Sequence, residues 1–174
     1  MAGTIWVFAY GSLMWRPGFA YESSEPALLE GYHRALCVSS YVHRGTRQRP
    51  GLVLGLDRGG RCRGRAFGIA PVREPEVLTY LDERELVTDV YQRRRLPVTL
   101  ASGPTVEAWC YLVRRDHEQY VGHLPEAERL RRIRQASGIS GPCAEYLHNT
   151  VAHLRTMGIR EAELERLALL AGRG

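Results

Sequence analysis

Apolar and polar positions alternate in a way that divides the chain into a strand-rich first part and a helical last third. Residues 5–15 begin with β-branched and aromatic side chains, which are typical of a buried strand, and the chain leaves that strand at Gly11. Further apolar runs at 36–42, 52–56 and 64–69 are separated by loops rich in glycine, proline or arginine. We interpret these runs as a meander of short strands.

Two later runs, 95–100 and 106–113, predict further strands, and Pro97 favours an edge position because proline lacks a backbone N–H. Beyond them the apolar spacing is helical, and we expect three helices, with the limits Pro125 to Gly138, Pro142 to Gly158, and Leu164 to Ala171. Many short strands followed by grouped helices predict an α+β fold with a closed or strongly curled sheet. No G-x-G-x-x-G segment follows a strand, so nothing favours a dinucleotide-binding fold.

One predicted helix interrupts the strands. Residues 75–86 begin with proline and acidic side chains, as helix N-termini often do, and Val77, Leu78 and Leu81 form an apolar stripe. At about 100° per residue, one further turn extends this stripe to Glu85. An ionised carboxylate on a buried helix face is costly unless it is paired or its pKa rises. Glu85 is therefore a candidate proton carrier.

The alternative for this glutamate is an ordinary acid at a helix end, paired with one of three arginines, Arg84, Arg93 or Arg94. Asp82 falls on the border of the helix and Glu83 on its opposite face, so we interpret both as solvated or ion-paired residues.

The turn after the first strand is the second chemical feature. Glycine tolerates positive φ and lets a ligand approach the main chain, so the N–H groups of Gly11, Ser12 and Leu13 are expected to converge on an anion. Which anion they hold stays open, and the alternative is an ordinary Gly-Ser turn. We interpret Ser12 as a binding residue and not as a nucleophile, because the sequence fixes no histidine beside it.

Length and composition narrow the class of protein. With 174 residues and 44% hydrophobic side chains, we expect one domain over residues 1–174. No apolar run approaches the length of a membrane span and no signal-peptide pattern is present, so we expect a soluble, cytoplasmic protein.

Cysteine, histidine and charge exclude several kinds of site. Cys37, Cys62, Cys110 and Cys143 form no C-x-x-C pair and are expected to be small core residues in a reducing compartment. The histidines lack metal-ligand spacing, so no metal is expected. The net charge is +5 and every basic side chain is arginine, which excludes Schiff-base and P-loop lysine chemistry. The arginine clusters are interpreted as solvated surface, and attraction of small anions is an equally good use of the charge.

Eight segments carry a resemblance that runs nearly end to end: VFAYGSLMW at 7–15, GYHR at 31–34, HRG at 43–45, PGLVL at 50–54, YLDERE at 80–85, VY at 90–91, SGISGP at 137–142 and EYL at 145–147. Together they resemble the ChaC family of glutathione-specific γ-glutamylcyclotransferases. The resemblance implies a small mixed β-barrel flanked by helices that cleaves glutathione to 5-oxoproline and cysteinylglycine without a cofactor. We expect no nucleic-acid, membrane or obligate protein partner.

The resemblance also implies site residues. The family's catalytic glutamate falls on Glu85, and its substrate-binding turn falls on Ala9, Tyr10, Gly11, Ser12, Leu13 and Met14. Phenol donors to the substrate could come from Tyr10, Tyr91, Tyr120 and Tyr146, or these could be half-buried core aromatics. Motif position favours Tyr91 and Tyr146. Arg44 could pair equally with a substrate carboxylate or with surface acids.

The chemistry needs only proton transfer and a folded substrate. In a γ-glutamyl amide the substrate's own α-amine can attack its δ-carbonyl, and Glu85 is expected to move the proton. Two other functions remain open: a cyclotransferase acting on another γ-glutamyl amine or peptide, and a non-enzymatic module that binds anions or nucleic acid.

Overall fold

A computed structural model describes residues 3–86 and 88–172 of the chain. They gather into two compact units. The first consists of the chain up to Arg34 together with Leu56–His117, and the second of Ala35–Gly55 together with the chain from Glu118 onward. The expectation of one domain over residues 1–174 stays a prediction.

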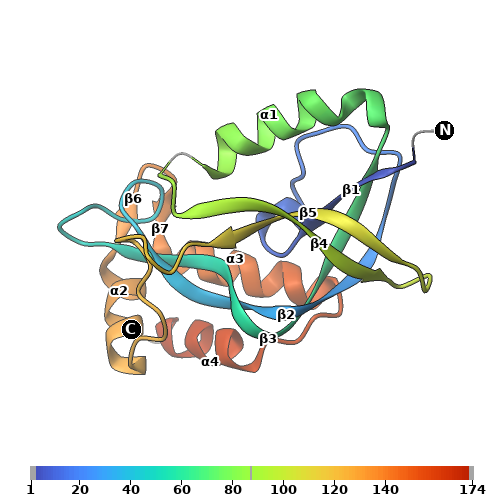
Figure 1. The fold of residues 1–174 in the computed structure, drawn as a ribbon. Coiled ribbons are helices and arrows are strands. Elements are labelled where there is room, and N and C mark those ends of the chain that lie inside the picture. Colours follow the sequence, from blue (N-terminus) through green and yellow to red (C-terminus); the bar gives the residue numbers. More distant parts are fainter. Residues whose placement is uncertain (1–2, 87, 173–174) are drawn as a thin grey trace. The chain divides into compact units, whose positions relative to one another are not determined.

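The main sheet is a closed barrel with the strand order β1-β3-β2-β4-β5 (Figure 1). The strands are β1 (Ile5–Ala9), β2 (Ser23–Ser40), β3 (Gly51–Ile69), β4 (Tyr91–Leu100) and β5 (Thr105–Val113). Val7 of β1 stands opposite Phe67 in an antiparallel pairing and opposite Trp109 in a parallel one. The predicted mixed barrel of an α+β fold is confirmed. The predicted meander of three short strands is wrong, because the runs 52–56 and 64–69 belong to one strand, β3, which is the neighbour of β2.

Strands β2 and β3 are much longer than the sequence pattern predicted. The segments 52–56 and 64–69, expected as separate strands, are both parts of β3. Gly59 and Gly60 lie inside this strand with φ of 104° and 69°. Glycines that suggested a loop therefore bend a continuous strand, as at a β-bulge, and do not end it.

Strand β4 tolerates its proline because of how it is paired. Among the described residues β4 pairs with β2 only at Leu28 opposite Thr99 and Ala27 opposite Leu100. On its other side Pro97 stands opposite Glu107 of β5. The N–H that Pro97 lacks therefore removes no ladder bond to β2.

Helix α1 (Glu74–Glu85) follows the 3-10 turn η2 (Pro71–Arg73) and lies along β4 and β5 in the first unit (Figure 1). Its buried residues are Val77 and Leu81, as the apolar stripe predicted, whereas Leu78 of that stripe is only half-buried. Trp109 and Tyr111 of β5 anchor the helix, since the Trp109 Nε1–H donates to Glu74 at 2.9 Å and the Tyr111 hydroxyl donates to Asp82 at 2.8 Å. Residues 110 and 112 of β5 therefore face the opposite side of the strand.

The second unit contains three helices that pack on one another: α2 (Glu126–Gln135), α3 (Cys143–Thr156) and α4 (Ala162–Ala171). Their positions confirm the helices predicted for the last third of the chain. A short hairpin of β6 (Ser137–Gly138) and β7 (Gly141–Pro142) was not predicted. All four cysteines are buried free thiols, in agreement with their expected core positions. Across the described residues, no helix combines the length and apolar character needed to cross a membrane.

Candidate active site

The turn after β1 is a single 3-10 turn, η1 (Ser12–Met14). The Met14 N–H donates to the Gly11 carbonyl at 2.9 Å. Gly11 has a φ of −131°, so the turn does not use the positive φ that glycine tolerates. Ser12 and Leu13 open the turn, and the N–H groups at the start of a helical turn have no partner within it. These two N–H groups are the main-chain donors that a ligand could use.

The residues that lead into the turn are buried and hydrogen-bonded to a neighbouring strand. Ala9 and Tyr10 are buried, as are Leu13 and Met14 within the turn. The buried Arg34 of β2 donates from Nε to the Tyr10 carbonyl at 2.6 Å and from Nη2 to the Arg63 carbonyl at 2.7 Å. The main chain entering η1 is therefore tied to β3 through a charged donor.

Glu85 is the last residue of α1, and its side chain is only 19% exposed. Burial raises the pKa of the Glu85 carboxyl, and the positive charge of Arg84 lowers it by a smaller amount. The only ion pair of this carboxylate among the described residues joins its Oε1 to Arg84 Nε at 3.6 Å. A largely buried carboxyl with a raised pKa is a stronger base than an exposed one and can still return the proton it accepts.

Arg84 connects the end of α1 to η1. Its Nη2 donates to the Ser12 hydroxyl at 2.8 Å, and its Nη1 donates to the Arg16 carbonyl at 2.8 Å and to the Tyr80 hydroxyl at 3.2 Å. The glutamate and the turn, which lie far apart in the sequence, are thus linked through one guanidinium group. We predicted Arg84 only as a possible ion-pair partner and missed this connection, for which the sequence gives no local signal.

The neighbouring charges secure the helix on the sheet. Asp82 pairs with Arg93 and accepts the Tyr111 hydroxyl, and the Arg93 guanidinium lies 5.0 Å from the centre of the Trp109 ring. Asp82 is therefore ion-paired, which was one of its two predicted states, and Arg93 pairs with Asp82 and not with Glu85. Tyr91 begins β4 opposite Val113 and is half-buried.

The other predicted binding residues lie in the second unit. The Arg44 guanidinium stands 5.6 Å from the centre of the Tyr146 ring, and its Nη1 donates to the Pro142 carbonyl at 3.2 Å. The Tyr146 hydroxyl accepts the Leu54 N–H at 3.0 Å, and Tyr120 forms a β-bridge with Val38. Arg44 and Tyr146 are thus brought together, each with a main-chain partner of its own.

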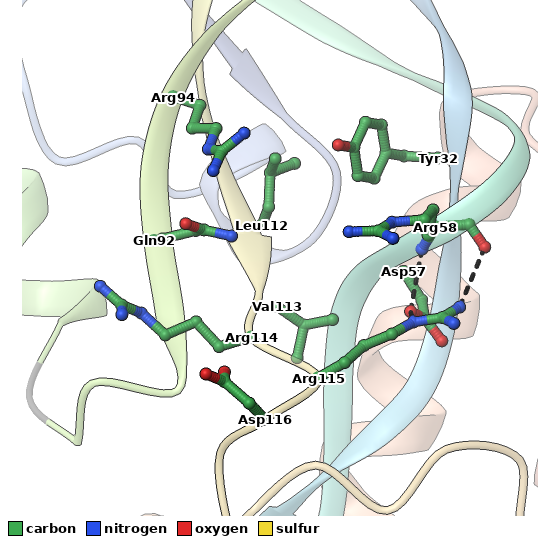
Figure 2. A pocket seen from close by; sticks show the side chains of 10 residues that line it. All are labelled: Tyr32, Asp57, Arg58, Gln92, Arg94, Leu112, Val113, Arg114, Arg115 and Asp116. Atoms are coloured by element: carbon green, nitrogen blue, oxygen red, sulfur yellow. Dashed lines mark hydrogen bonds and ion pairs between the residues drawn. The ribbon is translucent and has the colours of Figure 1, made fainter.

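A cavity of about 250 Å³ in the first unit is separate from these residues. Its walls come from the strands β2 to β5 and from the segment that follows β5 (Figure 2). Neither Glu85 nor any of residues 9–14 lines it.

Residues 5–172 match the sequence profile of the family described as ChaC-like protein. The chain belongs to the ChaC-like family. The family resemblance of the sequence motifs is thereby confirmed. Glutathione-specific gamma-glutamylcyclotransferase of Escherichia coli (strain K12) is 33% identical to this ChaC-like chain over 165 residues, covering 95% of the chain and 71% of that protein. Glutathione-specific gamma-glutamylcyclotransferase 1 of Homo sapiens is 31% identical over 170 residues, covering 95% and 76%.

A solved structure agrees with the fold. The crystal structure of a gamma-glutamyl cyclotransferase specific to glutathione from yeast matches this ChaC-like chain with a TM-score of 0.83 at 25% identity, covering 98% of each chain.

Proposed function

We propose that this ChaC-like protein is a γ-glutamylcyclotransferase that converts glutathione to 5-oxoproline and cysteinylglycine. The observation that carries the proposal is the buried Glu85 carboxyl, which Arg84 links to the turn at Ser12. The similar proteins from Escherichia coli, human and yeast bear this activity in their names, which supports glutathione as the substrate.

The reaction is an intramolecular ring closure. The α-amine nitrogen of the glutamyl residue attacks its own δ-carbonyl carbon, a C–N bond forms, and the bond from that carbon to the cysteinyl nitrogen breaks. No external nucleophile, water or electron carrier is needed. Holding the two reacting groups in contact can contribute about 7–11 kcal/mol to the lowering of the barrier.

Glu85 serves as the proton carrier. As a carboxylate it accepts a proton from the α-ammonium group, which frees the lone pair for attack. It then donates that proton to the departing amide nitrogen, so the carboxylate is regenerated. The attacking nitrogen loses one more proton when the lactam N–H forms, and the departing cysteinyl amine takes it up and leaves as an ammonium group. Because burial raises the pKa of the Glu85 carboxyl, the group is a stronger base and still able to return the proton.

The turn η1 supplies hydrogen-bond donors to the substrate. The N–H groups of Ser12 and Leu13 bind either the developing oxyanion or a substrate carboxylate, and Arg84 fixes the Ser12 side chain at the end of α1. Removing one such donor from an oxyanion typically lowers the rate by about 10²–10³-fold. Arg84 acts here as a positioning residue.

The remaining assignments stay predictions from the sequence. They are contacts to substrate from Tyr91, Arg44, Tyr120 and Tyr146, the absence of a cofactor, and the absence of an obligate protein partner. We also propose a cytoplasmic location, which the four buried free thiols support because reducing compartments keep cysteines unpaired.

Incubating the purified protein with reduced glutathione tests the proposal. The expected result is release of 5-oxoproline and cysteinylglycine in equal amounts. Other γ-glutamyl peptides and amines, supplied at the same concentration, provide the comparison. Release of 5-oxoproline from those compounds but not from glutathione would contradict the assigned substrate.

A further inference from the structure

The cavity in the first unit has a structural origin in the barrel. Strands β2 and β4 are paired at Leu28 and Thr99, near one end of β4. Tyr32 and Gln92 lie further along the two strands, past this pairing, and both line the cavity. Leu112, buried on β5 opposite Gln92, also lines it and gives it an apolar floor. Among the described residues β2 and β4 pair only near Leu28 and Thr99, so the opening lies where these two strands are not paired.

Hydrogen-bond donors converge over this floor. Figure 2 shows the Tyr32 hydroxyl and the Arg58 guanidinium directed inward from one side, and the Gln92 amide and the Arg94 guanidinium directed inward from the other. These side chains come from β2, β3 and β4 and are directed toward the space beside Leu112 (Figure 2). Two guanidinium groups and a phenol form a donor set suited to an oxyanion.

Two acidic side chains, Asp57 and Asp116, line the cavity, and Asp57 already has partners. Asp57 is buried, and its Oδ1 accepts Arg115 Nε at 2.7 Å and the Arg58 backbone N–H at 2.8 Å. Within the part of the chain that the structure describes, the side chains of Arg58 and Arg94 make no hydrogen bond or ion pair. The four arginines of the lining, Arg58, Arg94, Arg114 and Arg115, outnumber its two aspartates, so the cavity carries a net positive charge that would stabilise a bound anion.

We propose that this cavity is a second ligand site, which binds a small oxyanion, a carboxylate or a phosphate, between Arg58 and Arg94. The Tyr32 hydroxyl and the Gln92 amide add hydrogen bonds. The volume of about 250 Å³ lies below the range usual for pockets that take drug-sized ligands, so the occupant is small. Because no residue of α1 or η1 lines the cavity, this site goes beyond the proposed cyclotransferase function.

Isothermal titration calorimetry at low ionic strength tests the site, with inorganic phosphate and succinate as separate probes. The wild-type protein is expected to show saturable one-site binding of at least one probe, and the tighter probe identifies the chemistry as phosphate or carboxylate. Arg58→Gln and Arg94→Gln should each weaken binding about tenfold or more. Arg61→Gln is the matched control, because Arg61 is an exposed arginine on the same strand as Arg58 and does not line the cavity.

Glu85→Gln should bind the probe as the wild type does, which separates this site from the proposed catalytic one. Added salt should weaken binding, because both guanidinium groups are exposed. If a variant fails to fold, NMR spectra of the wild-type protein test the site instead. Adding the probe should change the chemical shifts of the Gln92 side-chain amide and the Leu112 methyl groups. No saturable binding of either probe, equal weakening by Arg61→Gln, or shifts confined to other residues would overturn the proposal.

Discussion

Replacing Arg84 by glutamine tests how the buried glutamate is kept available as a base. Arg84 Nε lies 3.6 Å from Glu85 Oε1, and the two side chains are 24% and 19% exposed. Two opposite unit charges at that distance attract by about 1 kcal/mol in water and about 5 kcal/mol at an effective dielectric constant of about 20. Because both side chains retain some contact with solvent, we expect a loss near the lower end of this range.

The direction in which the pH profile shifts follows from the charge of Glu85 in the active enzyme. Glu85 must be ionised to accept the substrate proton, burial already raises the pKa of its carboxyl, and Arg84 opposes that rise. Without Arg84 the carboxyl stays protonated to a higher pH, so the acid limb of kcat/KM moves to higher pH. A loss of about 1.4 kcal/mol in the attraction between Arg84 and Glu85 corresponds to about tenfold lower kcat/KM on the acid limb. On the plateau Glu85 is already ionised, so the change in its pKa has a much smaller effect there.

The assay is the pH profile of 5-oxoproline release, with two comparison variants. Arg84→Lys keeps the positive charge but not the full set of guanidinium hydrogen bonds, so it should retain the wild-type pH profile even if its plateau is lower. Arg73→Gln removes an ion pair to Glu76 of the same 3.6 Å length that is far more exposed, and it should leave the profile unchanged. An acid limb that does not move in Arg84→Gln would refute the reasoning.

Two further predictions concern stability. Gly18 and Gly158 have nearly equal φ, 76° and 74°, but a Cβ at Gly18 would lie 1.9 Å from the Tyr80 hydroxyl whereas one at Gly158 meets open space. Gly18→Ala should therefore lower the melting temperature more than Gly158→Ala, and equal losses would contradict the close packing. Because burial raises the pKa of the Glu85 carboxyl, its contribution to stability is present at low pH and is lost as pH rises through the folded-state pKa. Glu85→Gln should thus have a higher free energy of unfolding than the wild type, measured by urea denaturation at neutral and higher pH. A lower free energy of unfolding there would contradict this prediction, because it would mean that interactions with the protein offset the cost of burying the ionised carboxylate.

Local periodicity was enough to find the main candidate residue. The spacing of Val77 and Leu81 places Glu85 on the covered face of α1, and the structure gives the helix nearly the predicted limits. Helical phase is a property of neighbouring residues, so it can be read without knowledge of the tertiary fold. Proline and glycine at the ends of the later helices were informative for the same reason.

The pattern of apolar and polar residues gave wrong or missing predictions where contacts between distant segments determine the structure. Gly59 and Gly60 suggest a loop, and only pairing across the barrel keeps the chain in strand β3. The contacts of Arg84 with Ser12 and of Arg93 with Asp82 join residues whose proximity no local spacing reveals. The sequence did not predict the cavity, because its hydrogen-bond donors come from three different strands. No local spacing shows that these residues lie close together.

The central claim is that one buried carboxyl carries the proton in glutathione cleavage. The most direct test compares 5-oxoproline release by wild type, Glu85→Gln and Glu83→Gln at saturating reduced glutathione. Glu83 lies on the exposed face of the same helix and is the matched control. We predict that Glu85→Gln lowers kcat by about 10²-fold or more with little change in KM, and that Glu83→Gln has near-normal turnover. Near-normal turnover in Glu85→Gln would contradict the account.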